Sequence, residues 1–144
     1  MDWNYSVTND AWLIFKNGEG YWLQRFLKKG FGHVLYLTRD KYNWIAHDPH
    51  KLKLCSFVPP YKVSDDLPRL LRADGYTVIK ITFFDRSTKT KIRHSRLNNC
   101  VAFVKYALGI KLFTFTPFGL YKKLLTLSER KKFKNGIRNV QIIF

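Results

Sequence analysis

The residue best suited to covalent chemistry in this chain is a cysteine at the predicted start of a helix. Cys100 lies in the stretch NNCVAFVKYALGI. Val101, Val104 and Leu108 recur at the spacing of one helix face, and Gly109 follows where a helix would end, which predicts a helix from Cys100 to Gly109. A thiol in the first helical turn meets unpaired backbone N–H groups and the positive end of the helix dipole, and both favour the thiolate.

Two interpretations of Cys100 stand side by side. The upstream cations Arg93 and Arg96, together with His94, add positive potential and strengthen the case for a nucleophile. The alternative is a small apolar residue that faces the core. A nucleophile needs a base, so the choice between the two depends on what the rest of the chain supplies.

His33 is the candidate base. It opens a predicted strand directly after Gly32, and the stretch GHVLYLTRDKYNWIAHDP predicts a hairpin whose second strand returns toward it. A base histidine needs a third polar group to fix its tautomer and orientation. His47 and Asp48 are both placed to supply that group, on opposite faces of the second strand. Alternation alone leaves the choice between them open.

A metal-binding interpretation of the same region uses His47, His50 and Cys55 as zinc ligands. Their spacings of three and five residues suit zinc, but the set lacks a clear fourth ligand and a paired-cysteine knuckle. The chain also has no Gly-rich phosphate loop and no serine nucleophile elbow. We therefore expect no metal and no cofactor.

The elements that must position these residues alternate between strand and helix patterns. We expect strands near 12–15, 33–37, 43–48, 51–59, 76–84 and 135–144, and helices near 21–30, 64–75, 100–109 and 116–133. Ser64 is the expected N-cap of the second helix, whose Leu67, Leu70 and Leu71 share one face. This order predicts one α+β domain over residues 1–144 with a basic C-terminal extension from about residue 126.

Composition narrows the class of protein. The chain has 144 residues, 46% of them hydrophobic, which is enough for one domain with a real core. No apolar run is long enough to span a bilayer, and the first residues lack the apolar segment of a secretion signal. Two cysteines are too few for a disulfide framework. We therefore expect a protein made in the cytoplasm, with free thiols.

The charge is strongly positive, with 26 Lys and Arg against 10 Asp and Glu and a formal net charge of +16. Such a chain is attracted to polyanions, so we expect an anionic partner: a nucleic acid backbone, a cell-wall polymer or an acidic protein of an assembly. The cations concentrate in residues 86–96 and 122–138. The candidate polyanion-binding residues are Lys89, Lys91, Arg93, Arg96, Lys131 and Lys132.

The order of histidine strand, polar strand and cysteine helix resembles the circularly permuted branch of the papain-like superfamily. That branch includes NlpC-type cell-wall hydrolases and lecithin retinol acyltransferase-like proteins. GHVLYLTRDKYNWIAHDP is similar to its histidine hairpin and NNCVAFVKYALGI to its cysteine helix. Over residues 11–125 the chain is also similar to small proteins of tailed phages and alphaproteobacteria, which share WL…GFGH, W…DP, GYTV, CVAFVKYALGI and TPFGLYKKLL.

The resemblance implies an antiparallel sheet packed with a cysteine-bearing helix. It makes Cys100 the nucleophile and His33 the base, within hydrogen-bond reach of each other. The phage-type proteins suggest Asp48 as the orienting group, while the retinol acyltransferase-like proteins have a histidine that aligns, with a one-residue offset, near His47. The backbone N–H of Cys100 would belong to the oxyanion hole.

Two functions of different classes follow. The first is a cysteine amidase, peptidase or acyltransferase, with cell-wall peptide as the natural substrate of a phage-encoded enzyme. The second is a non-catalytic structural component of a phage particle or a nucleic-acid-associated assembly, which uses the papain-like fold as a basic binding module. In both cases the protein is made in the cytoplasm, and incorporation into a virion fits the second directly.

Overall fold

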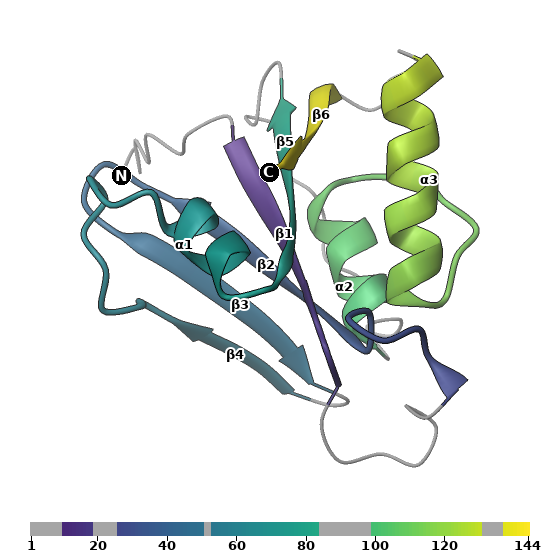
Figure 1. The fold of residues 1–144 in the computed structure, drawn as a ribbon, viewed down its shortest axis with the longest axis horizontal. Coiled ribbons are helices and arrows are strands. Elements are labelled where there is room, and N and C mark those ends of the chain that lie inside the picture. Colours follow the sequence, from purple (N-terminus) through teal and green to yellow (C-terminus); the bar gives the residue numbers. More distant parts are fainter. Residues whose placement is uncertain (1–9, 19–25, 51–52, 84–98, 131–136) are drawn as a thin grey trace, which may run out of the picture.

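A six-stranded antiparallel sheet organises the chain (Figure 1). The computed structural model describes residues 10–18, 26–50, 53–83, 99–130 and 137–144. The strand order across the sheet is β4-β3-β2-β1-β5-β6. The strands are β1 (Asp10–Lys16), β2 (His33–Arg39), β3 (Trp44–His50), β4 (Lys53–Phe57), β5 (Thr77–Phe83) and β6 (Ile137–Ile143).

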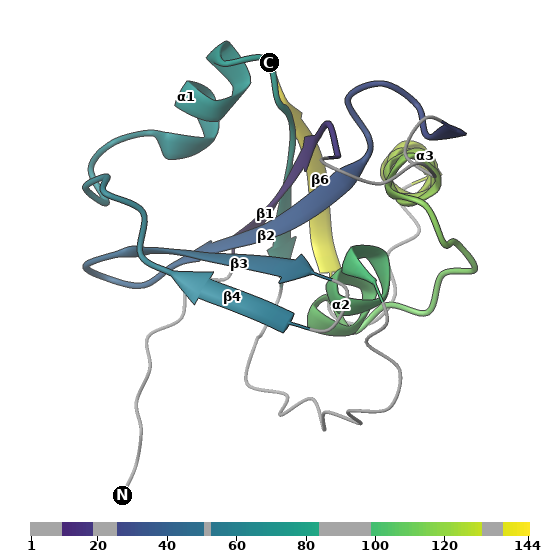
Figure 2. The ribbon, with the colours of Figure 1, turned by 90° about the horizontal axis from the view of Figure 1, so that it is seen from below.

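Three helices in the described residues cover the two faces of this sheet. They are α1 (Leu67–Ala73), α2 (Cys100–Ala107) and α3 (Pro117–Arg130). Helix α1 lies on one side of the sheet, whereas α2 and α3 lie together on the other side (Figures 1 and 2). Each face therefore has its own hydrophobic cluster.

The alternation of β1 shows how the two clusters are built. Leu13 and Phe15 point into the larger cluster with α2 and α3, whereas Trp12 and Ile14 point into the smaller cluster with α1. All four side chains are buried. A strand that is apolar on both faces belongs in the middle of a covered sheet, and β1 pairs with β2 on one side and with β5 on the other.

The hairpin of β2 and β3 has the register that places the candidate site. Tyr36 lies opposite His47 and Arg39 opposite Trp44. Asp40 closes the turn: its backbone N–H donates to the Asn43 carbonyl at 3.0 Å, and its carboxylate accepts from the Asn43 N–H at 2.6 Å. The turn fixes which residues of the two strands face each other.

The expected α+β class and the strands are confirmed, and the helix near 64–75 is shorter than expected. Its N-cap is Asp66, whose carboxylate accepts from the Arg69 N–H at 3.3 Å, and Ser64 is not the cap. The chain turns first at Asp65, which bonds the Lys62 N–H at 2.9 Å, so the helix begins only at Leu67. Of the helix expected near 21–30, residues 21–25 lie outside the described residues, and residues 26–30 are described and form no α-helix.

The contrast between two leucines tests this packing. Leu120 of α3 is fully buried in the larger cluster, whereas Leu70 of α1 is 46% exposed. We expect Leu120→Ala to lower the free energy of unfolding by about 2–5 kcal/mol, because it opens a cavity under α3. Leu70→Ala serves as the control and should change it by less than about 1 kcal/mol. Urea denaturation measures both, and equal losses would contradict the assigned core.

Candidate functional site

The cysteine helix begins where the sequence predicts. Asn99 has extended backbone angles and acts as the N-cap, since its side-chain oxygen accepts from the Ala102 N–H at 2.8 Å. Cys100 is the first helical residue. Val101 and Val104 bury the helix face against the sheet, and Gly109 follows with a φ of +65°, which a glycine adopts at little cost. Local sequence thus fixes the position of the thiol.

The Cys100 thiol is half-buried between α2 and the start of β2. The backbone N–H groups of Val34, Val101 and Cys100 itself lie close enough to lower the pKa of the thiol, and the charge of Asp48 acts to raise it. Burial is the largest influence, and the net effect raises the pKa of Cys100 above its ordinary value. This direction opposes the thiolate that the helix terminus alone predicts.

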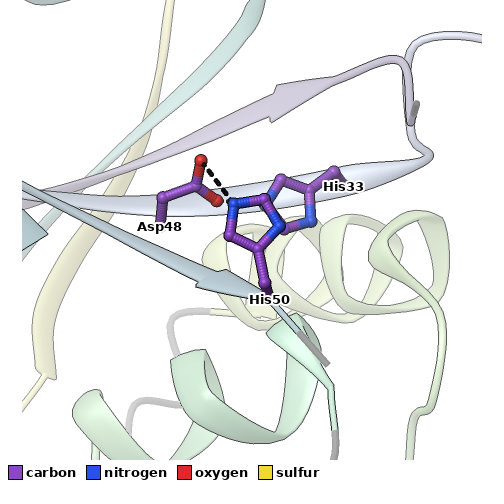
Figure 3. A network of polar contacts seen from close by, with 3 residues as sticks. All are labelled: His33, Asp48 and His50. Carbon is purple, nitrogen blue, oxygen red and sulfur yellow. Dashed lines mark hydrogen bonds and ion pairs between the residues drawn. The ribbon is translucent and has the colours of Figure 1, made fainter. Parts of the chain in front are cut away.

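His33 and Asp48 form the closest polar contact of the region (Figure 3). His33 Nε2 lies 2.5 Å from Asp48 Oδ1, and each side chain is only 14% exposed. An ionised carboxylate only accepts hydrogen bonds, so Nε2 carries the proton of this contact. In the neutral ring the other nitrogen, Nδ1, then keeps a free lone pair and can accept a proton.

A second histidine contacts the same carboxylate. His50 Nε2 lies 3.3 Å from Asp48 Oδ2, and the His50 and His33 rings stack at an interplanar angle of 18° with their centroids 5.6 Å apart (Figure 3). Both carboxylate oxygens of Asp48 are thus engaged by imidazoles. The sequence interpretation assigned His50 only to the zinc alternative, although residues 48 and 50 must share a face of any strand.

His47 lies on the opposite face of β3 from Asp48. Its Nδ1 lies 2.8 Å from Ser56 Oγ, and its ring packs near Tyr36 and Phe103. Of the two candidates for the orienting group, the structure therefore brings Asp48 to His33. His47 contributes to the contact between the hairpin and α2.

The zinc alternative is not formed by the residues proposed for it. His47 and His50 leave β3 on opposite faces, and Cys55 is exposed on β4. More generally, the residues that the structure describes contain no group of three or more His, Cys, Asp or Glu side chains that could hold a metal ion.

The Cys100 thiol contacts the backbone of β2 beside His33. The thiol meets the backbone N–H of Val34, the residue that follows His33. The hydrogen bonds found among the described residues do not include one between Cys100 and His33. The Cys100 side chain, the Asp48 carboxylate and the start of β2 nevertheless occupy one neighbourhood, since the charge of Asp48 is felt at the sulfur.

The six candidate polyanion-binding residues, Lys89, Lys91, Arg93, Arg96, Lys131 and Lys132, lie outside the described residues. Within the described part of the chain, no helix is long and apolar enough to cross a membrane. Comparisons with protein-family models, with curated proteins and with solved structures find no match to the chain.

The raised pKa predicts how the two thiols respond to alkylation. Iodoacetamide attacks thiolate, so we expect half-buried Cys100 to react more slowly than exposed Cys55 at neutral pH. The rate at Cys100 should rise with pH toward a midpoint above that of an ordinary thiol, because burial raises the pKa of Cys100. Mass spectrometry of the two tryptic peptides measures both rates. Faster labelling of Cys100 at pH 7 would show a thiolate and contradict the burial argument.

Proposed function

We propose that this chain is a cysteine hydrolase of the permuted papain-like kind, similar to NlpC-type cell-wall hydrolases, that cleaves an amide bond through Cys100 and His33. The observation that carries the proposal is the His33–Asp48 pair, which leaves Nδ1 of His33 able to accept a proton, together with the effect of the Asp48 charge on the Cys100 thiol. A carboxylate, an imidazole and a thiol at a helix N-terminus are the three groups that acyl transfer by a cysteine requires.

The proposed reaction starts from the neutral thiol. As the sulfur attacks the carbonyl carbon, its proton passes to Nδ1 of His33, and Asp48 stabilises the imidazolium through Nε2. The carbonyl oxygen becomes an oxyanion, to which the backbone N–H of Cys100 donates. When the C–N bond breaks, the imidazolium returns the proton to the leaving amine and a thioester remains. Water then attacks the thioester with His33 as base, which releases the acid and restores the thiol.

Peptide of the bacterial cell wall is the proposed substrate. Its amide bonds suit the thiol chemistry, and the anionic polymers of the wall suit a protein of net charge +16. Synthesis in the host cytoplasm, with incorporation into a virion, is the setting that goes with this proposal. A thiol that stays protonated until a carbonyl is bound also limits side reactions before the enzyme reaches the wall.

Release of new amine and carboxyl ends from purified cell-wall sacculi tests the hydrolase. We expect Cys100→Ser and His33→Ala each to lower the rate by about 10²–10⁴-fold, since each removes a group that acts in the transition state. Asp48→Asn should lower it too, because the amide no longer stabilises the imidazolium. Cys55→Ser is the matched control and should keep the wild-type rate. Activity that survives in folded Cys100→Ser protein would refute the mechanism.

The second candidate function is a basic binding module without catalysis, for which the observation is the charge excess of Lys and Arg. In that case the papain-like domain would serve as a structural component of a particle or of a nucleic-acid-associated assembly. The interaction would be with phosphates or acidic side chains and would carry no sequence readout.

Duplex DNA binding at increasing salt tests the second function. Changing Lys89, Lys91 and Arg93 to Glu should weaken binding and flatten its dependence on salt, because fewer counterions are released. A triple variant at Lys29, Lys41 and Lys53, also changed to Glu, alters the net charge equally and serves as the control. If both triple variants bind alike, residues 86–96 are not a specific phosphate-binding surface and only the overall charge acts.

A further inference from the structure

The loop between α2 and α3 exposes two phenylalanine rings. Phe113 is 81% and Phe115 is 66% exposed, and the two rings contact each other edge to face, with centroids 5.0 Å apart. Single exposed apolar residues are common on proteins, but two adjacent large aromatic side chains form a patch that calls for a partner. We name residues 109–116 the Phe loop.

The Phe loop is held in this conformation by its own packing. Lys105 donates from Nζ to the carbonyl of Leu112 at 3.1 Å and to the carbonyl of Thr114 at 2.9 Å. Thr114 is buried against α3, where a Cβ added to Gly119 would come within 2.4 Å of its hydroxyl oxygen. With Thr114 fixed inward, its two neighbours point outward. The loop therefore holds both rings at the surface before any partner binds, which reduces the entropy lost on binding.

Cations surround the two rings. Lys123 Nζ lies 6.0 Å from the centroid of the Phe113 ring, and Lys105 Nζ lies 5.6 Å from that of Phe115. Lys111 and Lys122 are exposed nearby in the chain, and the sequence has no acidic residue from position 99 to position 128. The patch therefore combines apolar tips with a uniformly positive border.

The loop also lies at the margin of the molecule. It projects beyond α3 in Figure 1 and forms the outer edge on the same side in Figure 2. A flat surface can approach a projecting loop without meeting the rest of the protein first. This placement favours a broad, planar partner.

We propose that the Phe loop docks onto the surface of an anionic lipid bilayer. The two rings enter the boundary between headgroups and acyl chains, while the surrounding lysines bind the anionic headgroups. Stacking on the bases of single-stranded nucleic acid fits less well, since it needs accessible ring faces. Here the rings lie at 80° to each other and each has an ammonium group near it. The proposal does not depend on the hydrolase and holds equally for a binding module.

Sedimentation with lipid vesicles tests the docking. The probes are vesicles of phosphatidylcholine alone and of phosphatidylcholine with one third phosphatidylglycerol. We expect the wild type to bind the anionic vesicles. The double variant Phe113→Ser with Phe115→Ser should lower the partition coefficient at least about tenfold, because it loses the insertion of two aromatic rings while its charge is unchanged. The matched control is Tyr42→Ser with Phe144→Ser, which removes two exposed rings elsewhere.

The outcomes separate insertion from charge alone. Reduced binding of the Phe loop variant but not of the control variant, with equal thermal melting of all proteins, supports the proposal. Equal binding of the wild type and both variants shows that net charge suffices and overturns it. Absence of vesicle binding by the wild type at physiological salt also overturns it and leaves an acidic protein with an apolar socket as the partner to look for.

Discussion

The burial of β1 on both faces is the constraint on which the rest of the structure depends. Five consecutive residues from Ala11 to Phe15 are buried, so each face of the sheet needs its own cover. Ala11, Leu13 and Phe15 on one face belong to the larger cluster with α2 and α3, and Trp12 on the other face belongs to the cluster with α1. Placing Cys100 against the sheet is therefore a by-product of covering β1. The thiol comes to the start of β2 because α2 must lie there.

The same burial decides the chemical state of the cysteine. A helix N-terminus and three backbone N–H groups favour the thiolate, but removal of the sulfur from water opposes it more strongly. Both effects act on the Cys100 sulfur, and desolvation is the larger, so the pKa of the thiol is raised. In the proposed mechanism His33 therefore acts as a general base toward the Cys100 thiol, because the sulfur does not release its proton on its own.

Much of this fold follows from local sequence signals. The helix from Cys100, its Asn99 cap and its end at Gly109 all depend on residues within a few positions of one another, and so does the hairpin that joins His33 to Asp48. The choice between His47 and Asp48 could not be made in this way. It requires knowing which face of β3 the neighbouring strand and helix cover, and that depends on contacts between segments far apart in the chain.

The tight turn at Asp40 and Asn43 has a consequence for how this hairpin tolerates insertions and deletions. It sets Tyr36 opposite His47, and through that register it sets Asp48 on the face of His33. Gain of one residue in the turn that shifts the strand by one position would bring the His47 imidazole to the place of the Asp48 carboxylate, and loss of one residue would bring Pro49 there. A single inserted or deleted codon would thus remove the carboxylate from His33 while leaving the sequence of both strands unchanged.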